Sequence, residues 1–158
     1  MSDNDTEMKI DGLEHLLKAL KNKPPTIRVG ILGSGNARDS QGGATNDFIG
    51  MQHEFGSVRV PKRSFLREPL ADNIGKAMES SGALDADILK QAIKTGSVKP
   101  WCDKIAVLAE GIVLEAFDSG GYGKWKALKP STLRDKKNAQ ILVETGQLRN
   151  SITSEVIE

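Results

Sequence analysis

The chain of 158 residues has one cysteine, few aromatic residues and almost no net charge, and each shortage removes a class of protein. Cys102 alone cannot form an intrachain disulfide framework, which indicates a reducing compartment. A net charge of +1 gives no electrostatic reason to expect a nucleic-acid or membrane partner. No apolar run approaches the roughly 18 residues that span a bilayer, and the acidic N-terminus is unlike a signal peptide. We therefore expect a cytoplasmic protein.

Candidate catalytic and metal-binding residues are also scarce. His53 and Cys102 could be imagined as the base and the nucleophile of a thiol-dependent enzyme. A small thiol at the start of an apolar helix, however, is typical of a buried side chain. Metal sites need several ligands brought together, and the order of Gly30, Gly33 and Gly35 does not match a phosphate-binding loop, because no helix pattern follows. We expect no catalytic, cofactor or metal site.

Hydrophobic periodicity accounts for most of the remaining chain. Leucines spaced i, i+3, i+4, i+7 predict a helix over 12–21, with Asp11 as its N-cap. Alternating apolar residues predict strands over 26–32 and 151–157, and a strand-like segment over 58–60. Helical spacing continues over four longer segments, 47–55, 64–80, 85–94 and 99–117, and over two short turns, 131–137 and 144–150.

These segments predict an α+β fold in which a small antiparallel sheet packs against two or three helices. The chain length predicts a single domain over residues 1–158, with residues 1–9 disordered. Residues 33–46 contain four glycines and no core-forming side chain, so we expect a long flexible loop there.

The first informative motif is Glu54-Phe55-Gly56, followed by Pro61-x-Arg63-x-Phe65-Leu66-Arg67. The aromatic ring of Phe55 can hold a helix end while Gly56 adopts a positive φ. Proline fixes an extended approach, after which Phe65 and Leu66 enter the core or an interface. We expect Arg63 and Arg67 to point outward, where arginine can hold carboxylates bidentately at a subunit contact.

The second motif is the run from Leu142 to Ile152, in which Thr145-Gly146-Gln147-Leu148-Arg149 stands at the centre. Thr145 is a plausible cap for a short helical turn, and Leu148 anchors that turn before the chain enters the last strand. A third element, Trp125-x-x-Leu128-x-Pro130-Ser131-Thr132, precedes it.

Together these motifs resemble those of bacteriophage head–tail joining proteins, also described as neck, tail-completion or virion-morphogenesis proteins. The likeness covers roughly residues 26–70 and 120–157. In many relatives the Thr-Gly-x-Leu-Arg element comes before the Glu-Phe-Gly element, whereas here it follows. Residues that the resemblance marks as interface or anchor positions are Glu54, Phe55, Gly56, Pro61, Arg63, Phe65, Leu66, Arg67, Trp125, Thr145, Gly146, Leu148 and Arg149.

The resemblance implies a non-enzymatic virion protein without a cofactor. Such proteins form homo-oligomeric rings, often of six or twelve subunits, at the neck between portal or connector proteins and the tail tube or terminator proteins. DNA passes through the ring only as cargo, and no membrane is involved. The protein would then lie in the virion neck or tail, and in the host cytoplasm during assembly.

Two alternatives remain open. A tail terminator is the nearest role within the same class. In a different class, the basic segment 124–137 could track phosphates and make the chain a nucleic-acid-binding accessory protein. A solvated face or salt bridges to a neighbouring subunit explain the same charges, and few aromatic residues lie near them for base stacking.

Overall fold

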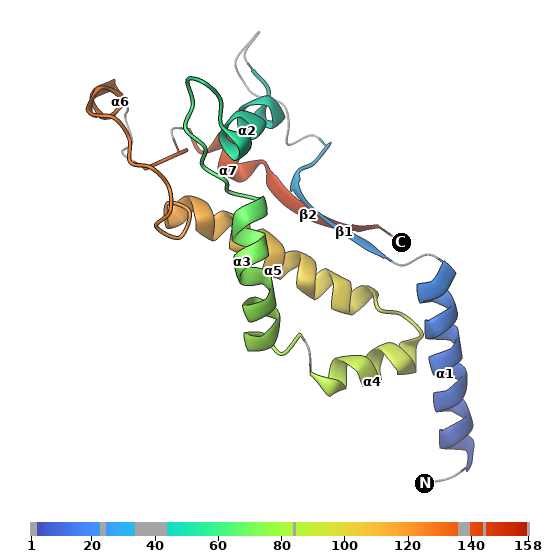
Figure 1. Ribbon diagram of the computed structural model, residues 1–158. Helices are drawn as coiled ribbons and strands as arrows, with labels where there is room; N and C mark the ends of the chain where they lie inside the picture. The colour runs from blue at the N-terminus through green and yellow to red at the C-terminus, as the bar shows by residue number, and fades with distance from the viewer. Residues whose placement is uncertain are drawn as a thin grey trace. The chain divides into compact units, whose positions relative to one another are not determined.

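The computed structural model describes most of the chain, namely residues 3–22, 25–33, 44–83, 85–135, 140–143 and 145–157. Helices dominate this part of the chain (Figure 1). The elements in order are α1 (Asp3–Asn22), β1 (Thr26–Ile31), α2 (Asn46–Phe55), α3 (Arg67–Ser80), α4 (Ala86–Thr95), α5 (Lys99–Asp118), α6 (Pro130–Asp135), α7 (Gln147–Asn150) and β2 (Ile152–Ile157).

The predicted α+β class is confirmed. β1 and β2 are the first and last predicted strands. They pair as an antiparallel two-stranded sheet, although most of the sequence lies between them. The predicted helices of 47–55, 85–94 and 99–117 are also present, with ends close to those expected. Gly96, directly after α4, adopts the left-handed conformation at φ 66°, which ends that helix as the Thr-Gly-Ser sequence predicts.

Three expectations for local structure need correction. α1 begins at Asp3, so residues 3–9 are helical where disorder was expected, and Asp11 lies inside the helix and does not cap it. Residues 58–60 form no strand, because Ser57 N–H donates to the carbonyl of Val60 and closes a tight turn there. Most of the predicted flexible loop of 33–46 lies outside the described residues, and its last residue, Asn46, begins α2.

The chain divides into two compact units. One unit comprises residues 1–28, 76–108 and 155–158, and the other comprises residues 29–75 and 109–154. The chain passes between the units four times, inside β1, α3, α5 and β2, so the units are not two domains in succession. The single domain expected from the chain length therefore stays a prediction.

In the first unit, α1 packs closely on α4. A Cβ at Gly12 would stand 2.2 Å from the carbonyl oxygen of Ile93, so only glycine allows this approach. Leu16 is the buried member of the predicted leucine stripe, whereas Leu13 and Leu17 remain more than a third exposed. Elsewhere in this unit the indole N–H of Trp101 donates to the carbonyl of Ala83 at 2.8 Å.

The second unit holds a hydrophobic core built from α5, α7, β2 and the segment before α3. Its buried members are Phe65, Val113, Ala116, Phe117, Leu148 and Ile152. The ring of Phe65 lies 5.0 Å from that of Phe117, which in turn meets the indole of Trp125 edge-on at 5.9 Å. Phe65 and Leu148 are thus core anchors, as the sequence predicts.

Candidate functional site

The carboxylate of Glu54, at the end of α2, is the group that joins the two halves of the first motif. It is 4% exposed and accepts hydrogen bonds from the backbone N–H groups of Phe65 and Leu66 at 2.9 and 3.0 Å. Its other oxygen accepts from the hydroxyl of Ser64 at 2.7 Å and from Arg67 N–H at 3.1 Å. Because helix starts leave N–H groups without intrahelical acceptors, this carboxylate caps α3 from another helix. We call this arrangement the Glu54 cap.

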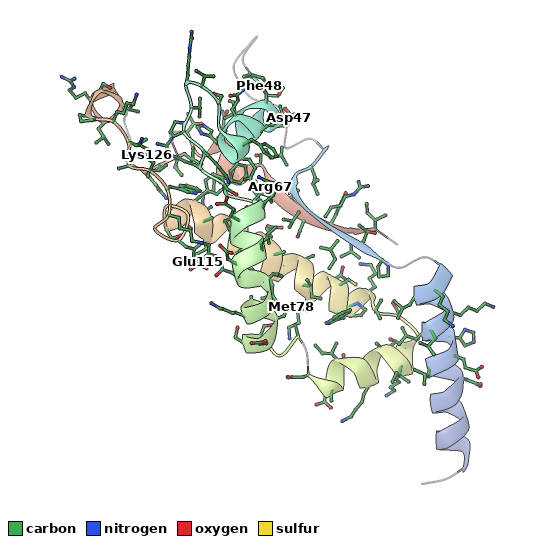
Figure 2. All side chains as sticks on the ribbon, in the orientation of Figure 1. Asp47, Phe48, Arg67, Met78, Glu115 and Lys126 are labelled. Atoms are coloured by element: carbon green, nitrogen blue, oxygen red, sulfur yellow. The ribbon has the colours of Figure 1, made fainter. Side chains whose placement is uncertain are left out.

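The Glu54 cap also has an electrostatic basis. Burial raises the pKa of the Glu54 carboxyl, but the hydrogen bonds from Ser64 and from three backbone N–H groups outweigh burial and lower the pKa overall. The guanidinium of Arg67 adds an ion pair at 3.2 Å and lies 4.4 Å above the ring of Phe55. Glu54 is therefore held as a charged group in the folded protein. Figure 2 shows Arg67 at the start of α3.

The 56–62 loop reverses the chain between α2 and the cap. Gly56 has φ 77°, as predicted, and a Cβ there would lie 3.0 Å from the backbone nitrogen of Lys62. The loop closes where Arg63 N–H donates to the carbonyl of His53 at 2.7 Å. Its tip is fully exposed at Val58, and Pro61 is exposed as well.

Arg63 does not point outward as expected. Only 7% of the residue is exposed, because its Nε and Nη2 donate to the carbonyl oxygen of Lys126 at 3.2 and 3.1 Å. Burial lowers the pKa of the Arg63 guanidinium. Arg67 follows the prediction only in part, since it is half exposed and engaged with Glu54 and Phe55.

Arg63 and Trp125 connect the third motif to the first. The indole N–H of Trp125 donates to the carbonyl of Ser64 at 2.9 Å, one residue after Arg63. The backbone at Gly121 passes so close to this indole that a Cβ would stand 2.1 Å from its nitrogen. Trp125 thus packs against the core of this unit.

The second motif meets α2 through α7. Gly146, at φ 75°, occupies the N-cap position of α7, and the predicted cap, Thr145, only accepts a long bond of 3.4 Å from Gln147 N–H. Leu148 is 5% exposed. Arg149 makes a bidentate ion pair with Asp118 at 3.1 and 2.8 Å. Motifs from three parts of the sequence therefore meet in one unit.

An apolar face of α2 adds two residues, Phe48 and Met51, to the site residues inferred from the sequence, which already include Phe55. Phe48, Met51 and Phe55 share a side of the helix by their spacing, and each is half or more exposed, at 50%, 55% and 58%. Phe48 projects from α2 beside Asp47 in Figure 2. We call these three residues the α2 face. The i, i+3, i+7 spacing of these residues is visible in the sequence, and it indicates a shared face of the helix.

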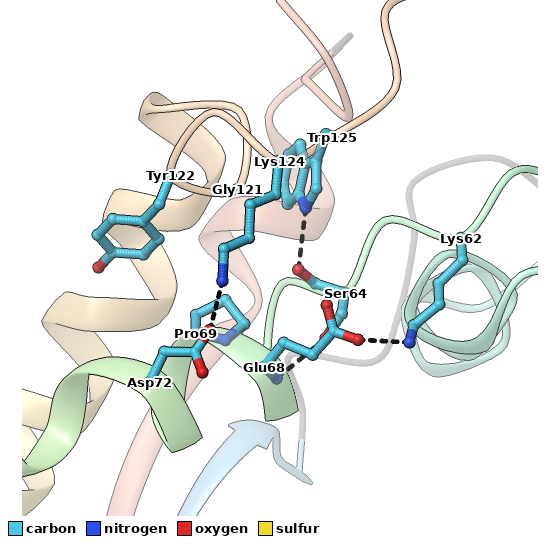
Figure 3. Close-up of a pocket in the computed structure, with 9 residues that line it drawn as sticks. All are labelled: Lys62, Ser64, Glu68, Pro69, Asp72, Gly121, Tyr122, Lys124 and Trp125. Carbon is cyan, nitrogen blue, oxygen red and sulfur yellow. Dashed lines mark hydrogen bonds and ion pairs between the residues drawn. The ribbon is translucent and has the colours of Figure 1, made fainter.

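A small hollow of about 90 Å³ lies beside the Glu54 cap (Figure 3). Its charged residues form two pairs, Lys62 with Glu68 and Lys124 with Asp72. Tyr122 also lines it, and burial together with the charge of Glu115 raises the pKa of that phenol to about 12. Its four charged side chains neutralise one another, which suits a structural role.

Three further features concern the thiol, metal binding and membrane insertion. Cys102 is buried on α5, in the first unit, as a structural thiol would be. Within the described ranges, no group of three or more His, Cys, Asp or Glu residues could hold a metal ion. No helix in the same ranges is long and apolar enough to cross a membrane. Comparison with protein-family models, curated sequences and solved structures finds no match to this chain.

Proposed function

We propose that the protein is a non-enzymatic component of a bacteriophage neck, which forms a ring that completes the tail or the head and joins the two. The observation that carries the proposal is the way the resembling motifs are used. Glu54 accepts from Phe65 N–H at the start of α3, and Trp125 donates to the carbonyl of Ser64. Arg63 donates to the carbonyl of Lys126, and Leu148 packs in the core. Motif residues that stabilise a rigid framework are expected in a structural protein to which other proteins bind.

The α2 face gives this framework a surface for protein contact. Exposed apolar side chains that stand singly are ordinary, but three on one side of a ten-residue helix form a contiguous patch. Such patches are typical of protein–protein contacts. A patch that meets a different surface on the next copy generates a closed ring when the rotation closes.

In this role the partners are further copies of the chain, portal or connector proteins on one side, and tail tube or terminator proteins on the other. DNA is cargo in the lumen. The protein is located in the virion neck or tail. A tail terminator remains the nearest alternative, and binding of the purified protein to tail tubes but not to portal complexes would favour it.

Removal of the gene from the phage tests the proposal. We expect separated heads and tails, or tails of faulty length, in electron micrographs of the lysate. Normal infectious particles would refute it.

A matched pair of variants tests the surface. We expect the double change Phe48→Ser with Met51→Ser to abolish ring formation in sedimentation experiments while the circular dichroism spectrum stays unchanged. The control is Val107→Ser, which removes a 69% exposed side chain from α5. Equal oligomerisation of both variants would show that the α2 face is not the contact.

A further inference from the structure

A second hollow in the same unit surrounds Arg63. It has a volume of about 290 Å³, close to the lower end of the range of small-ligand pockets, about 300 Å³. Its apolar walls come from Leu128, Leu142 and Leu148, and its polar wall includes Arg63 and Thr145. All of these residues belong to the second unit.

Arg63 is an unusual residue to find in such a wall. A buried charge is costly unless an opposite charge compensates it. Its two side-chain hydrogen bonds both go to one neutral acceptor, the carbonyl oxygen of Lys126. Among the residues that the structure describes, no carboxylate forms an ion pair with Arg63.

The guanidinium of Arg63 therefore has N–H donors that no protein acceptor uses among the described residues. It carries five N–H groups, and Lys126 accepts from only two of its nitrogens. A carboxylate is the partner that matches the geometry of this group bidentately. The leucine side chains beside it add a requirement, because a ligand that fills the hollow must bring apolar atoms as well as charge.

We propose that this hollow binds a carboxylate carried on a short apolar stem, with Arg63 as the residue that holds the charge. Two sources share that chemistry, an acidic side chain of a neighbouring protein and a free short-chain organic acid. The inference stands apart from the phage role, since it rests on the hollow and on Arg63 alone.

Titration of the full chain with butyrate, followed by ¹H–¹⁵N NMR, tests the proposal. We expect saturable shifts at the Arg63 Nε–H and at the amides of Thr145 and Leu148. Butyramide has the same shape without the charge and should cause none. Absence of saturation in the tens of millimolar, or equal shifts with butyramide or inorganic phosphate, would overturn the proposal.

Variants identify the residue and the source. Arg63→Lys keeps the positive charge but loses the paired N–H donors that bind a carboxylate bidentately, so we expect at least tenfold weaker butyrate binding. Unchanged affinity in a folded variant would overturn the role of Arg63. An acetylated and amidated Leu-Glu peptide that binds tenfold more tightly than butyrate would indicate a protein source, and equal affinity a free acid. Glu144 directly precedes Thr145 in the sequence, so Glu144→Gln tests whether the chain's own carboxylate competes for Arg63. We expect this change to alter butyrate affinity less than twofold. A tenfold gain would mean that the chain's own carboxylate occupies Arg63, and would overturn the proposal.

Discussion

Replacement of Glu54 by glutamine removes the charge of the Glu54 cap and one of its acceptor oxygens while keeping the side-chain shape. If the amide nitrogen takes the position facing the N–H groups of Phe65 and Leu66, both donors lose their acceptor. In the other orientation the hydroxyl of Ser64 and the N–H of Arg67 lose theirs. A buried polar group without a partner costs about 1–3 kcal/mol, so with two such donors we expect Glu54→Gln to lower the free energy of unfolding by about 2–6 kcal/mol.

The pH dependence gives the same variant a second, independent readout. The pKa of Glu54 is lower in the folded protein than its ordinary value of about 4.5. The charge therefore stabilises the fold fully above that value, and the stabilisation is lost as the pH falls through the folded pKa. We expect the gap between wild type and Glu54→Gln to be largest at neutral pH and to narrow on acidification.

Urea unfolding monitored by circular dichroism at several pH values measures both effects. Glu68→Gln is the matched control, because Glu68 is a half-exposed carboxylate that pairs with Lys62, and such pairs contribute about 0–1 kcal/mol. The reasoning fails if the two variants lose equal stability at neutral pH, or if the loss in Glu54→Gln does not depend on pH.

Two further predictions concern backbone and surface charge. Gly56→Ala places a Cβ 3.0 Å from the backbone nitrogen of Lys62 at a positive φ, so we expect it to lower the free energy of unfolding by about 1–3 kcal/mol. Gly75→Ala places a Cβ in open space on α3, and we expect it to raise the free energy of unfolding by about 0.5–1 kcal/mol. Thermal unfolding that ranks the two variants the other way would contradict this. In Arg149→Ala the pKa of the Asp118 carboxyl, which the hydrogen bond and charge of Arg149 lower, should rise toward its ordinary value. An NMR titration of Asp118 checks it, and an unmoved pKa would contradict the bidentate pair.

Local sequence signals predicted the elements well where one physical rule decided the outcome. The glycine after Phe55 ends α2 because it alone tolerates the positive φ there. The helical spacing over 99–117 forms α5, and its buried residues, among them Ala109, Val113 and Ala116, recur at that spacing. Phe65 and Leu148 lie in the core because large apolar side chains are stabilised by burial.

Long-range partners could not be predicted in the same way. Nothing near Arg63 in the sequence indicates that its side chain donates to the carbonyl of Lys126, so the sequence alone favoured an outward position. Glu54 was singled out as part of a motif, but its role depends on a loop that returns the chain to the same place. The strand expected at 58–60 does not form, because the turn hydrogen bonds outweigh the strand preference of two valines, Val58 and Val60, at an exposed loop tip.

The 56–62 loop is closed at its base, so changes at its tip should leave the structure of α2 and α3 unaffected. His53 and Arg63 fasten the two ends, and the Glu54 cap holds the start of α3 without any help from residues 57–61. Lengthening a closed loop costs only about 0.6 kcal/mol for each doubling. This stretch is accordingly the natural graft point of the molecule, where a peptide tag or a new recognition sequence can be inserted while the framework beneath keeps its geometry.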